Sequence, residues 1–225
     1  MRASEVLQAL RSLASGDVRA SMKRFGIKVD NAHGVTTPAL KALARKIGRD
    51  HQLAAELWDS GTFEARAVAA LIDEPDKVTR AQMDRWTRAF DSWAICDGCC
   101  CYLFRKTPFA WDKAVEWTTK PGEFAKRAGF ALMAYLAIHE KKASDESFAA
   151  FLPIIQREAD DDRLYVRKAV NWALRQIGKR SARLNALAIQ TAEAIRARDT
   201  RSARWIAADA LRELRSARVQ AKLGQ

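Results

Sequence analysis

Apolar residues recur at helical spacing along almost the whole chain, and this periodicity constrains the fold more than any other feature of the sequence. Caps and breakers separate the segments: Thr37 and Pro38 open a helix that Gly48 ends, and Asp50 caps the next one. Helices are predicted over residues 1–21, 37–47, 51–60, 63–73, 75–90, 92–104, 108–117, 122–140, 146–159, 163–178, 181–198 and 201–217. Pro153 should kink or restart its helix. Because no segment shows a convincing alternating strand pattern, an all-α fold is predicted.

Five of these segments share a sequence pattern, the frame. It has a charged residue at position i and mostly small residues at positions i+1 and i+4. The charged positions are Arg66, Asp97, Arg127, Lys168 and Arg204, so the steps are 31, 30, 41 and 36 residues. Steps of this size, each holding two helices, are typical of HEAT-type solenoids, with a generic helical array as the alternative. We predict that residues 1–225 form a single domain, a right-handed superhelical solenoid of HEAT-like helix pairs.

The frame positions fall near the start of the second helix in each predicted pair. Stacked pairs would align them in a row along one surface, the concave one, with four cations flanking one carboxylate. The whole chain is basic, with 39 Lys and Arg against 27 Asp and Glu and a formal net charge of +12. A basic concave face of this kind favours nucleic acid as the partner, and an indifferent solvated face is the alternative.

Other classes of protein are disfavoured by what the sequence lacks. No apolar run approaches the ~18–20 residues of a membrane span, and residues 1–21 form an amphipathic segment, unlike a signal peptide. We therefore expect a cytoplasmic protein without membrane contact. All four cysteines lie between Cys96 and Cys101. Zinc would need a second ligand pair, and His33, His51 and His139 are scattered, so we predict no metal and interpret the cysteines as packing residues.

Trp93 and Asp97 carry the most informative chemistry, because they lie one turn apart on one face of a predicted helix. Aspartate favours caps over helix interiors, and it is seldom buried without a partner. The pair therefore indicates a pocket that receives a positive charge, with a solvated Asp beside a core Trp as the alternative. Trp58, Trp86, Trp111 and Trp117 are interpreted as core, and Trp205 as packing.

Three segments resemble the AlkD-type DNA glycosylases, bacterial HEAT-like-repeat enzymes that release alkylated purines from DNA. They are SWAICDGCC (92–100), FAKRAGFALMAYLA (124–137) and YVRKAVNWALRQIGK (165–179), and SMKRFGI with TTPALKALARKI is similar to the family's opening segment. The resemblance covers about residues 15–215. Ser21 departs from it, since the family places a tyrosine before Met-Lys to wall the lesion cleft.

The resemblance implies that Asp97 is the catalytic aspartate, that Trp93 and Trp172 are the cleft tryptophans, and that Arg127 is the conserved arginine. Lys126 takes the place of the family's preceding arginine. The row and the resemblance together assign DNA binding to Arg66, Lys126, Arg127, Arg167, Lys168 and Arg204.

The expected activity is that of a monomeric, monofunctional glycosylase. It would hydrolyse the N-glycosidic bond of cationic N3- or N7-alkylpurines in double-stranded DNA, without a cofactor or a base-flipping pocket, in the bacterial cytosol and nucleoid. Two alternatives stay open: a non-catalytic binder of damaged, bent or branched DNA that uses the same groove, and a protein-interaction solenoid. The sequence does not specify which alkyl lesions are accepted.

Overall fold

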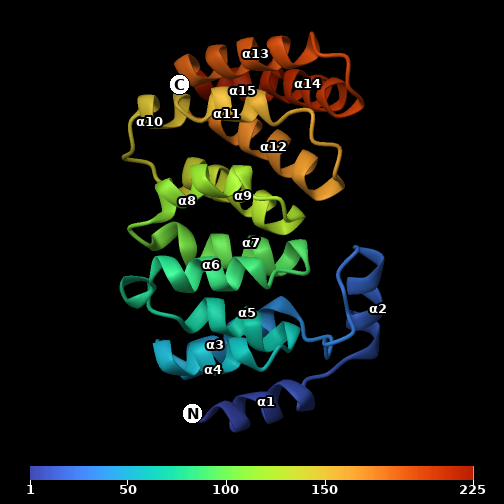
Figure 1. Cartoon of the computed structure of the whole chain (residues 1–225), viewed down its shortest axis with the longest axis vertical. Helices are drawn as coiled ribbons and strands as arrows, with labels where there is room; N and C mark the ends of the chain where they lie inside the picture. Colours follow the sequence, from blue (N-terminus) through green and yellow to red (C-terminus); the bar gives the residue numbers. More distant parts are fainter. Residues whose placement is uncertain (225) are drawn as a thin grey trace. The chain divides into compact units, whose positions relative to one another are not determined.

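The computed structural model describes residues 1–224, and within them the regular structure is helical throughout (Figure 1). The chain divides into two compact units, Met1–Phe109 and Ala110 onward. The all-α prediction is confirmed. Among the described residues, no helix combines the length and the apolar character needed to cross a bilayer.

The first unit pairs short helices around an aromatic core. Its elements are α1 (Ala3–Ser12), α2 (Gly16–Arg24), α3 (Thr37–Ile47), α4 (His51–Asp59), α5 (Phe63–Ile72), η1 (Pro75–Lys77), α6 (Arg80–Arg88), α7 (Trp93–Tyr102) and η2 (Phe104–Lys106). Helix α5 packs against α3, α4 and α7. The indoles of Trp58 and Trp86 stack in parallel at 4.0 Å between centroids, which confirms that both are core residues.

The second unit repeats the pairing with longer helices. Its elements are α8 (Ala110–Glu116), η3 (Trp117–Thr119), α9 (Glu123–His139), α10 (Asp145–Ala149), α11 (Leu152–Arg157), α12 (Leu164–Ile177), α13 (Ala182–Arg196), α14 (Arg201–Leu214) and α15 (Ala217–Leu223). Helices α9, α12 and α14 pack side by side, and α8, α11 and α13 pack against this row (Figure 1). Trp117 is buried as predicted, whereas Trp111 is half-buried against Phe148 and Phe151.

Local signals placed most helix ends correctly. Asp50 caps α4 by accepting a hydrogen bond from the Leu53 amide at 2.9 Å, and Gly48 ends α3 at a φ of 82°, which favours glycine. Pro153 lies in the first turn of α11, so the chain restarts there as predicted. The single helix predicted over residues 1–21 is wrong: the chain forms α1 and α2, separated at Ser15, whose side chain caps α2.

A buried glutamate holds the loop that follows α2. Glu64, on α5, is fully buried and accepts hydrogen bonds from the backbone amides of His33, Gly34 and Val35 at 2.8–3.3 Å. The Ser15 amide bonds the His33 carbonyl in turn. A carboxylate buried with this many donors is satisfied, so α2 is attached firmly to α5 despite its long loop.

Candidate nucleic-acid interface

The five frame residues all lie in the first two turns of their helices: Arg66 on α5, Asp97 on α7, Arg127 on α9, Lys168 on α12 and Arg204 on α14. Each unit therefore presents its frame residues at the same end of adjacent helices. Arg66 and Asp97 belong to the first unit and the other three to the second. The continuous row and the single domain of residues 1–225 stay predictions.

In the first unit, α7 begins with Trp93 because Ser92 caps it through a hydrogen bond from the Ala94 amide at 3.2 Å. The Trp93 indole N–H donates to the Phe25 carbonyl at 3.0 Å, which fixes the ring against the end of α2. Trp93 and Asp97 are both half-buried. An indole with a satisfied N–H and a partly open surface can offer its face to a cation, and the carboxylate one turn away can add a negative charge.

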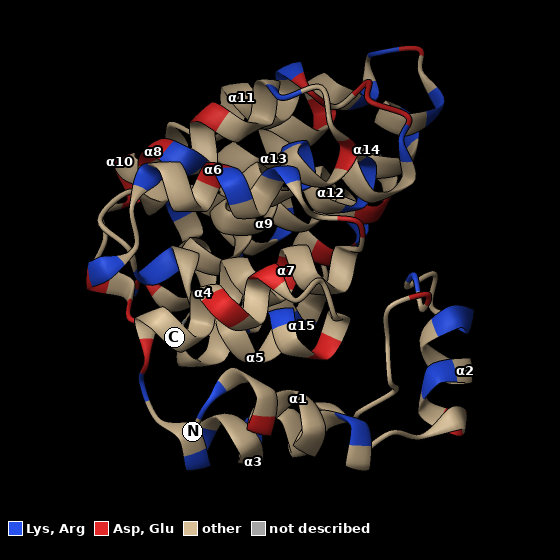
Figure 2. Cartoon of the chain, turned by 60° about the horizontal axis from the view of Figure 1, so that its bottom comes forward, with Lys and Arg blue, Asp and Glu red and all other residues tan. Residues whose placement is uncertain are grey.

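Phe25 was not identified as a candidate from the sequence, yet it is the most exposed large apolar side chain beside Trp93, at 69%. It lies one turn beyond Ser21, the position where the family places its tyrosine. Three cations on the adjoining helix, Arg19, Lys23 and Arg24, make α2 strongly basic (Figure 2). The sequence signal for a role of Phe25 is its position four residues, or one helical turn, after Ser21, and this signal is weak.

Arg66 lies close to the start of α7. It shares the lining of a cavity of about 120 Å³ with Asp91 and Ile95, and its guanidinium lies over the Trp58 ring at 5.2 Å. One guanidinium nitrogen also donates to the Ala89 carbonyl at 3.4 Å. Arg66 is thus half-buried and held between Trp58 and the segment that precedes α7.

In the second unit, Arg127 is nearly buried, with 7% of its surface exposed. Its guanidinium donates to the Tyr165 carbonyl at 2.8 Å, and this contact joins α9 to the start of α12. The Tyr165 amide bonds Glu123 on α9 at 3.0 Å. The arginine is therefore fixed in place before any ligand arrives.

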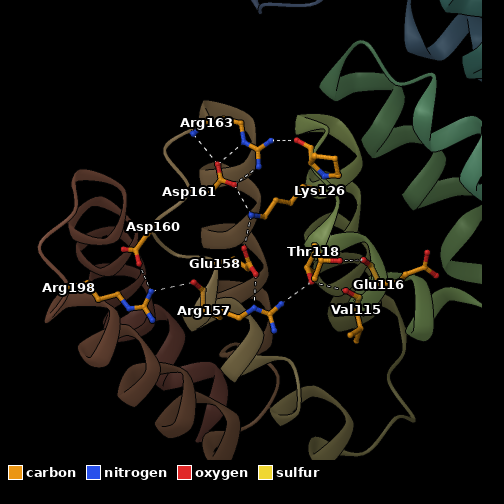
Figure 3. Close-up of polar contacts among 12 residues, drawn as sticks. Val115, Glu116, Thr118, Lys126, Arg157, Glu158, Asp160, Asp161, Arg163 and Arg198 are labelled. Atoms are coloured by element: carbon orange, nitrogen blue, oxygen red, sulfur yellow. Dashed lines mark hydrogen bonds and ion pairs between the residues drawn. The ribbon is translucent and has the colours of Figure 1, made fainter.

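Lys126 occupies a network of charges (Figure 3). Its ammonium lies 2.6 Å from Glu158 and 2.8 Å from Asp161, and Asp161 also pairs with Arg163 at 2.5 Å. Burial alone would lower the pKa of Lys126, but hydrogen bonds to the two carboxylates raise it. Conversely, burial would raise the pKa of Asp161, while Arg163 and Lys126 lower it to about 2. Lys126 is thus engaged with carboxylates, and its predicted role in DNA binding stays a prediction.

Trp172 is half-buried on α12. Tyr135 meets it edge-on, with ring centroids 4.8 Å apart and an interplanar angle of 85°. The amide oxygen of Gln176, oriented toward Trp172 and Lys179, accepts hydrogen bonds from the Trp172 N–H at 3.2 Å and from Lys179 Nζ at 3.1 Å. Side chains of the same unit therefore hold this second predicted cleft tryptophan.

Trp205 differs from its interpretation as a packing residue, because 39% of it is exposed. The Arg167 guanidinium lies over its ring at 5.1 Å. Two other predicted DNA-binding residues, Lys168 and Arg204, are also exposed, and Arg204 forms an ion pair with Asp199. An exposed indole among cations is a common feature of nucleic-acid surfaces, and sequence pattern alone could not tell this face from a packed one.

The cysteine cluster is mainly a packing feature. Cys96, Cys99 and Cys100 are buried and Cys101 is half-buried. Burial raises the pKa of the Cys99 and Cys100 thiols well above the usual range. Within residues 1–224, no group of three or more His, Cys, Asp or Glu side chains is placed to hold a metal ion.

Comparison with known proteins adds two findings. The sequence model of a family described as DNA alkylation repair enzyme matches residues 6–214. A solved structure, described as a new family of proteins related to the HEAT-like repeat DNA glycosylases with affinity for branched DNA structures, matches with a TM-score of 0.80. That match has 21% sequence identity and covers 100% of this chain and 97% of the other, and it confirms the HEAT-like repeat fold. No curated protein matches the chain.

Proposed function

Because the chain belongs to the family of DNA alkylation repair enzymes, we propose that it is a monofunctional glycosylase for cationic N3- and N7-alkylpurines in double-stranded DNA. It acts as a monomer and without a cofactor. The positive charge on such a base makes it a good leaving group, and the bond to deoxyribose breaks as oxocarbenium character develops on the sugar. A catalyst for this reaction needs a fixed negative charge and electron-rich surfaces close to the sugar.

The observation that carries the proposal is the pairing of Trp93 and Asp97 on the first two turns of α7, both half-buried. Asp97 would stabilise the cationic transition state and orient the attacking water. Trp93 would offer its face to the sugar and the charged base. Its N–H is already bonded to the Phe25 carbonyl, so the ring needs no reorientation when DNA binds.

Residues of the second unit complete the proposed site. Trp172 would supply the second aromatic surface, and Arg127 would bind a phosphate next to the lesion through a charge-assisted hydrogen bond. The proposal requires Asp97 to lie between Trp93 and Trp172 when DNA is bound. Arg66, Arg167, Lys168 and Arg204 would contact the backbone on either side.

The test is base release from a duplex that carries one 7-methylguanine. The wild-type protein should release free 7-methylguanine well above the spontaneous rate, and Asp97→Asn should lower that rate by roughly 10²–10³-fold, as loss of one electrostatic stabiliser does. Asp76→Asn is the matched control, since it removes the same charge from an exposed position of the same unit. Release at the spontaneous rate by wild type, or equal release by wild type and Asp97→Asn, refutes the enzyme proposal.

A second candidate is a non-catalytic binder of branched DNA. It is favoured by the exposed aromatic side chains of Phe25 and Trp205, which could stack on unpaired bases, and by the affinity for branched DNA of the structurally similar protein. This candidate predicts a four-way junction bound more tightly than linear duplex, with no base release. Phe25→Ala should then weaken junction binding more than Leu13→Ala, which removes an exposed apolar side chain from the other side of Ser15.

A further inference from the structure

The second unit contains a basic cavity at the opposite ends of the helices that carry the frame residues. It has a volume of about 420 Å³ and lies where α9 and α12 end, with α15 beside them. Its charged lining consists of Lys141, Lys179, Arg180, Arg218 and Lys222, and no carboxylate from residues 1–224 is among the lining groups. Such a concentration of one charge sign is unfavourable unless a counter-charge occupies the cavity.

Two of the five cations already have structural partners. Arg180 donates to the carbonyls of Ala137, Glu140 and Ala143 at 2.7–3.2 Å, which satisfies the end of α9. Lys179 lies 2.6 Å from Glu213. These contacts explain why the two residues are present, and they leave the cavity's charge only partly compensated.

The other three cations have no such explanation. Lys141, Arg218 and Lys222 are exposed, and none of their side chains forms an ion pair or hydrogen bond with a described residue. Two helix C-termini contribute about half a negative charge each, and Glu213 contributes one more. Glu140 and Asp145, which lie outside the lining, also attract the Arg180 guanidinium, and Glu213 is shared between Lys179 and Arg175. Lys141, Arg218 and Lys222 are therefore the cations of the described lining that these charges do not pair with.

The cavity continues the face of α12 that bears Trp172. Gln176 lines it and, with its oxygen turned inward, bonds both Trp172 and Lys179. From Trp172 to the end of α12 at Ile177 the helix rises about 7.5 Å. This is close to the axial rise of about two base pairs of duplex, so a strand that passes Trp172 can reach the cavity with a nearby phosphate.

We propose that this cavity binds backbone phosphates of the DNA strand on one side of the lesion, through Lys141, Arg218 and Lys222. The proposal rests on the DNA binding argued above, but it does not require base release. Phosphate is the ligand whose charge and oxygen acceptors suit several converging ammonium and guanidinium groups. A free phosphate compound offers the same chemistry, and the experiment separates the two sources.

The test measures affinity for a lesion-free duplex as a function of salt. A triple variant carries Lys141→Ala, Arg218→Ala and Lys222→Ala, which are exposed positions where alanine should leave the fold intact. The matched control carries Arg11→Ala, Lys46→Ala and Arg88→Ala, and it removes the same charge from exposed positions of the first unit. Circular dichroism spectra and unfolding midpoints establish that both variants fold.

The plot of log K against log salt concentration should become shallower by about 2–3 in the triple variant, close to 0.9 for each phosphate that the protein no longer neutralises. The control should change this slope by less than about 1, because its three side chains touch no phosphate. Equal slopes in the two variants overturn the proposal. A second outcome also overturns it: inorganic pyrophosphate binds the wild-type protein but not the triple variant, while the two proteins have the same salt slope for DNA. The cavity would then bind a free phosphate compound and not the DNA backbone. Failure of base release leaves both slopes interpretable.

Discussion

Replacing Asp161 by asparagine tests whether the charge network beside α9 stabilises the second unit. The Asp161 side chain is 9% exposed and lies within 2.8 Å of cationic atoms of both Lys126 and Arg163 (Figure 3). These contacts lower its pKa from 3.8 to about 2. A difference of about 1.8 pKa units corresponds to about 2.4 kcal/mol at neutral pH, which solvent screening reduces to about 1–2 kcal/mol.

The sign of the pH dependence follows from the direction of the shift. Because the folded state lowers the pKa of Asp161, the stabilisation is complete well above pH 3.8 and is lost as the pH falls toward 2. The cost of Asp161→Asn should therefore be about 1–2 kcal/mol at pH 7, about half of that at pH 3, and small at pH 2. Lys126 keeps Glu158 as a partner in the variant, which limits the loss.

The assay is urea unfolding of the whole chain at pH 7, 4 and 3, followed by circular dichroism. Asp162→Asn is the control, because Asp162 is the next residue, is exposed, and forms no ion pair among the described residues. Its cost should stay within about 0.5 kcal/mol at every pH. The reasoning is refuted if both variants cost the same at pH 7, or if the cost of Asp161→Asn does not fall with pH.

Two further outcomes are expected. Gly129→Ala should destabilise the second unit by about 1–3 kcal/mol, because its new Cβ would lie 2.9 Å from backbone atoms of α8 and η3. At Gly98 an added Cβ meets no atom within 4 Å, so Gly98→Ala should instead stabilise the first unit by about 0.5–1 kcal/mol. Urea unfolding midpoints of the two variants test this, and equal midpoint changes would contradict the predicted clash at Gly129. Iodoacetamide at pH 8 should label Cys101 before Cys99 and Cys100, whose burial raises their thiol pKa values; mass spectrometry of peptides reads the order, and early labelling of Cys99 would contradict it.

The helix pairs could be predicted from the sequence because their signals are local. Capping by Asp50, the left-handed glycine at Gly48 and the restart at Pro153 each depend on a few neighbouring residues. The break at Ser15 has a local signal as well, because the Ser15 side chain caps α2 by accepting from the Val18 amide, but the placement of α2 could not be predicted in the same way. It depends on the His33 carbonyl and on the buried carboxylate of Glu64, which are distant in sequence. Amphipathic periodicity continues across the break and therefore gives no sign of it.

The site shows the same division between local and distant determinants. Trp93 and Asp97 could be paired from their spacing of four on one helix. The acceptor of the Trp93 N–H could not, because Phe25 lies 68 residues away and contributes only its backbone carbonyl. Trp205 illustrates the opposite difficulty. Its position in the frame indicated packing, but the exposure of a tryptophan depends on which neighbour covers it, and here Arg167 covers it only in part.

Backbone carbonyls hold two of the proposed functional side chains, and this affects how the site can change. The Trp93 N–H and the Arg127 guanidinium each bond a main-chain oxygen, of Phe25 and of Tyr165. A substitution at either acceptor residue keeps that oxygen, so the two groups stay oriented while the side chains around them vary. Trp172 depends on the side chains of Tyr135 and Gln176 instead. Pre-oriented groups contribute to catalysis without reorganisation, so variation among related chains should alter the setting of Trp172 before that of Trp93.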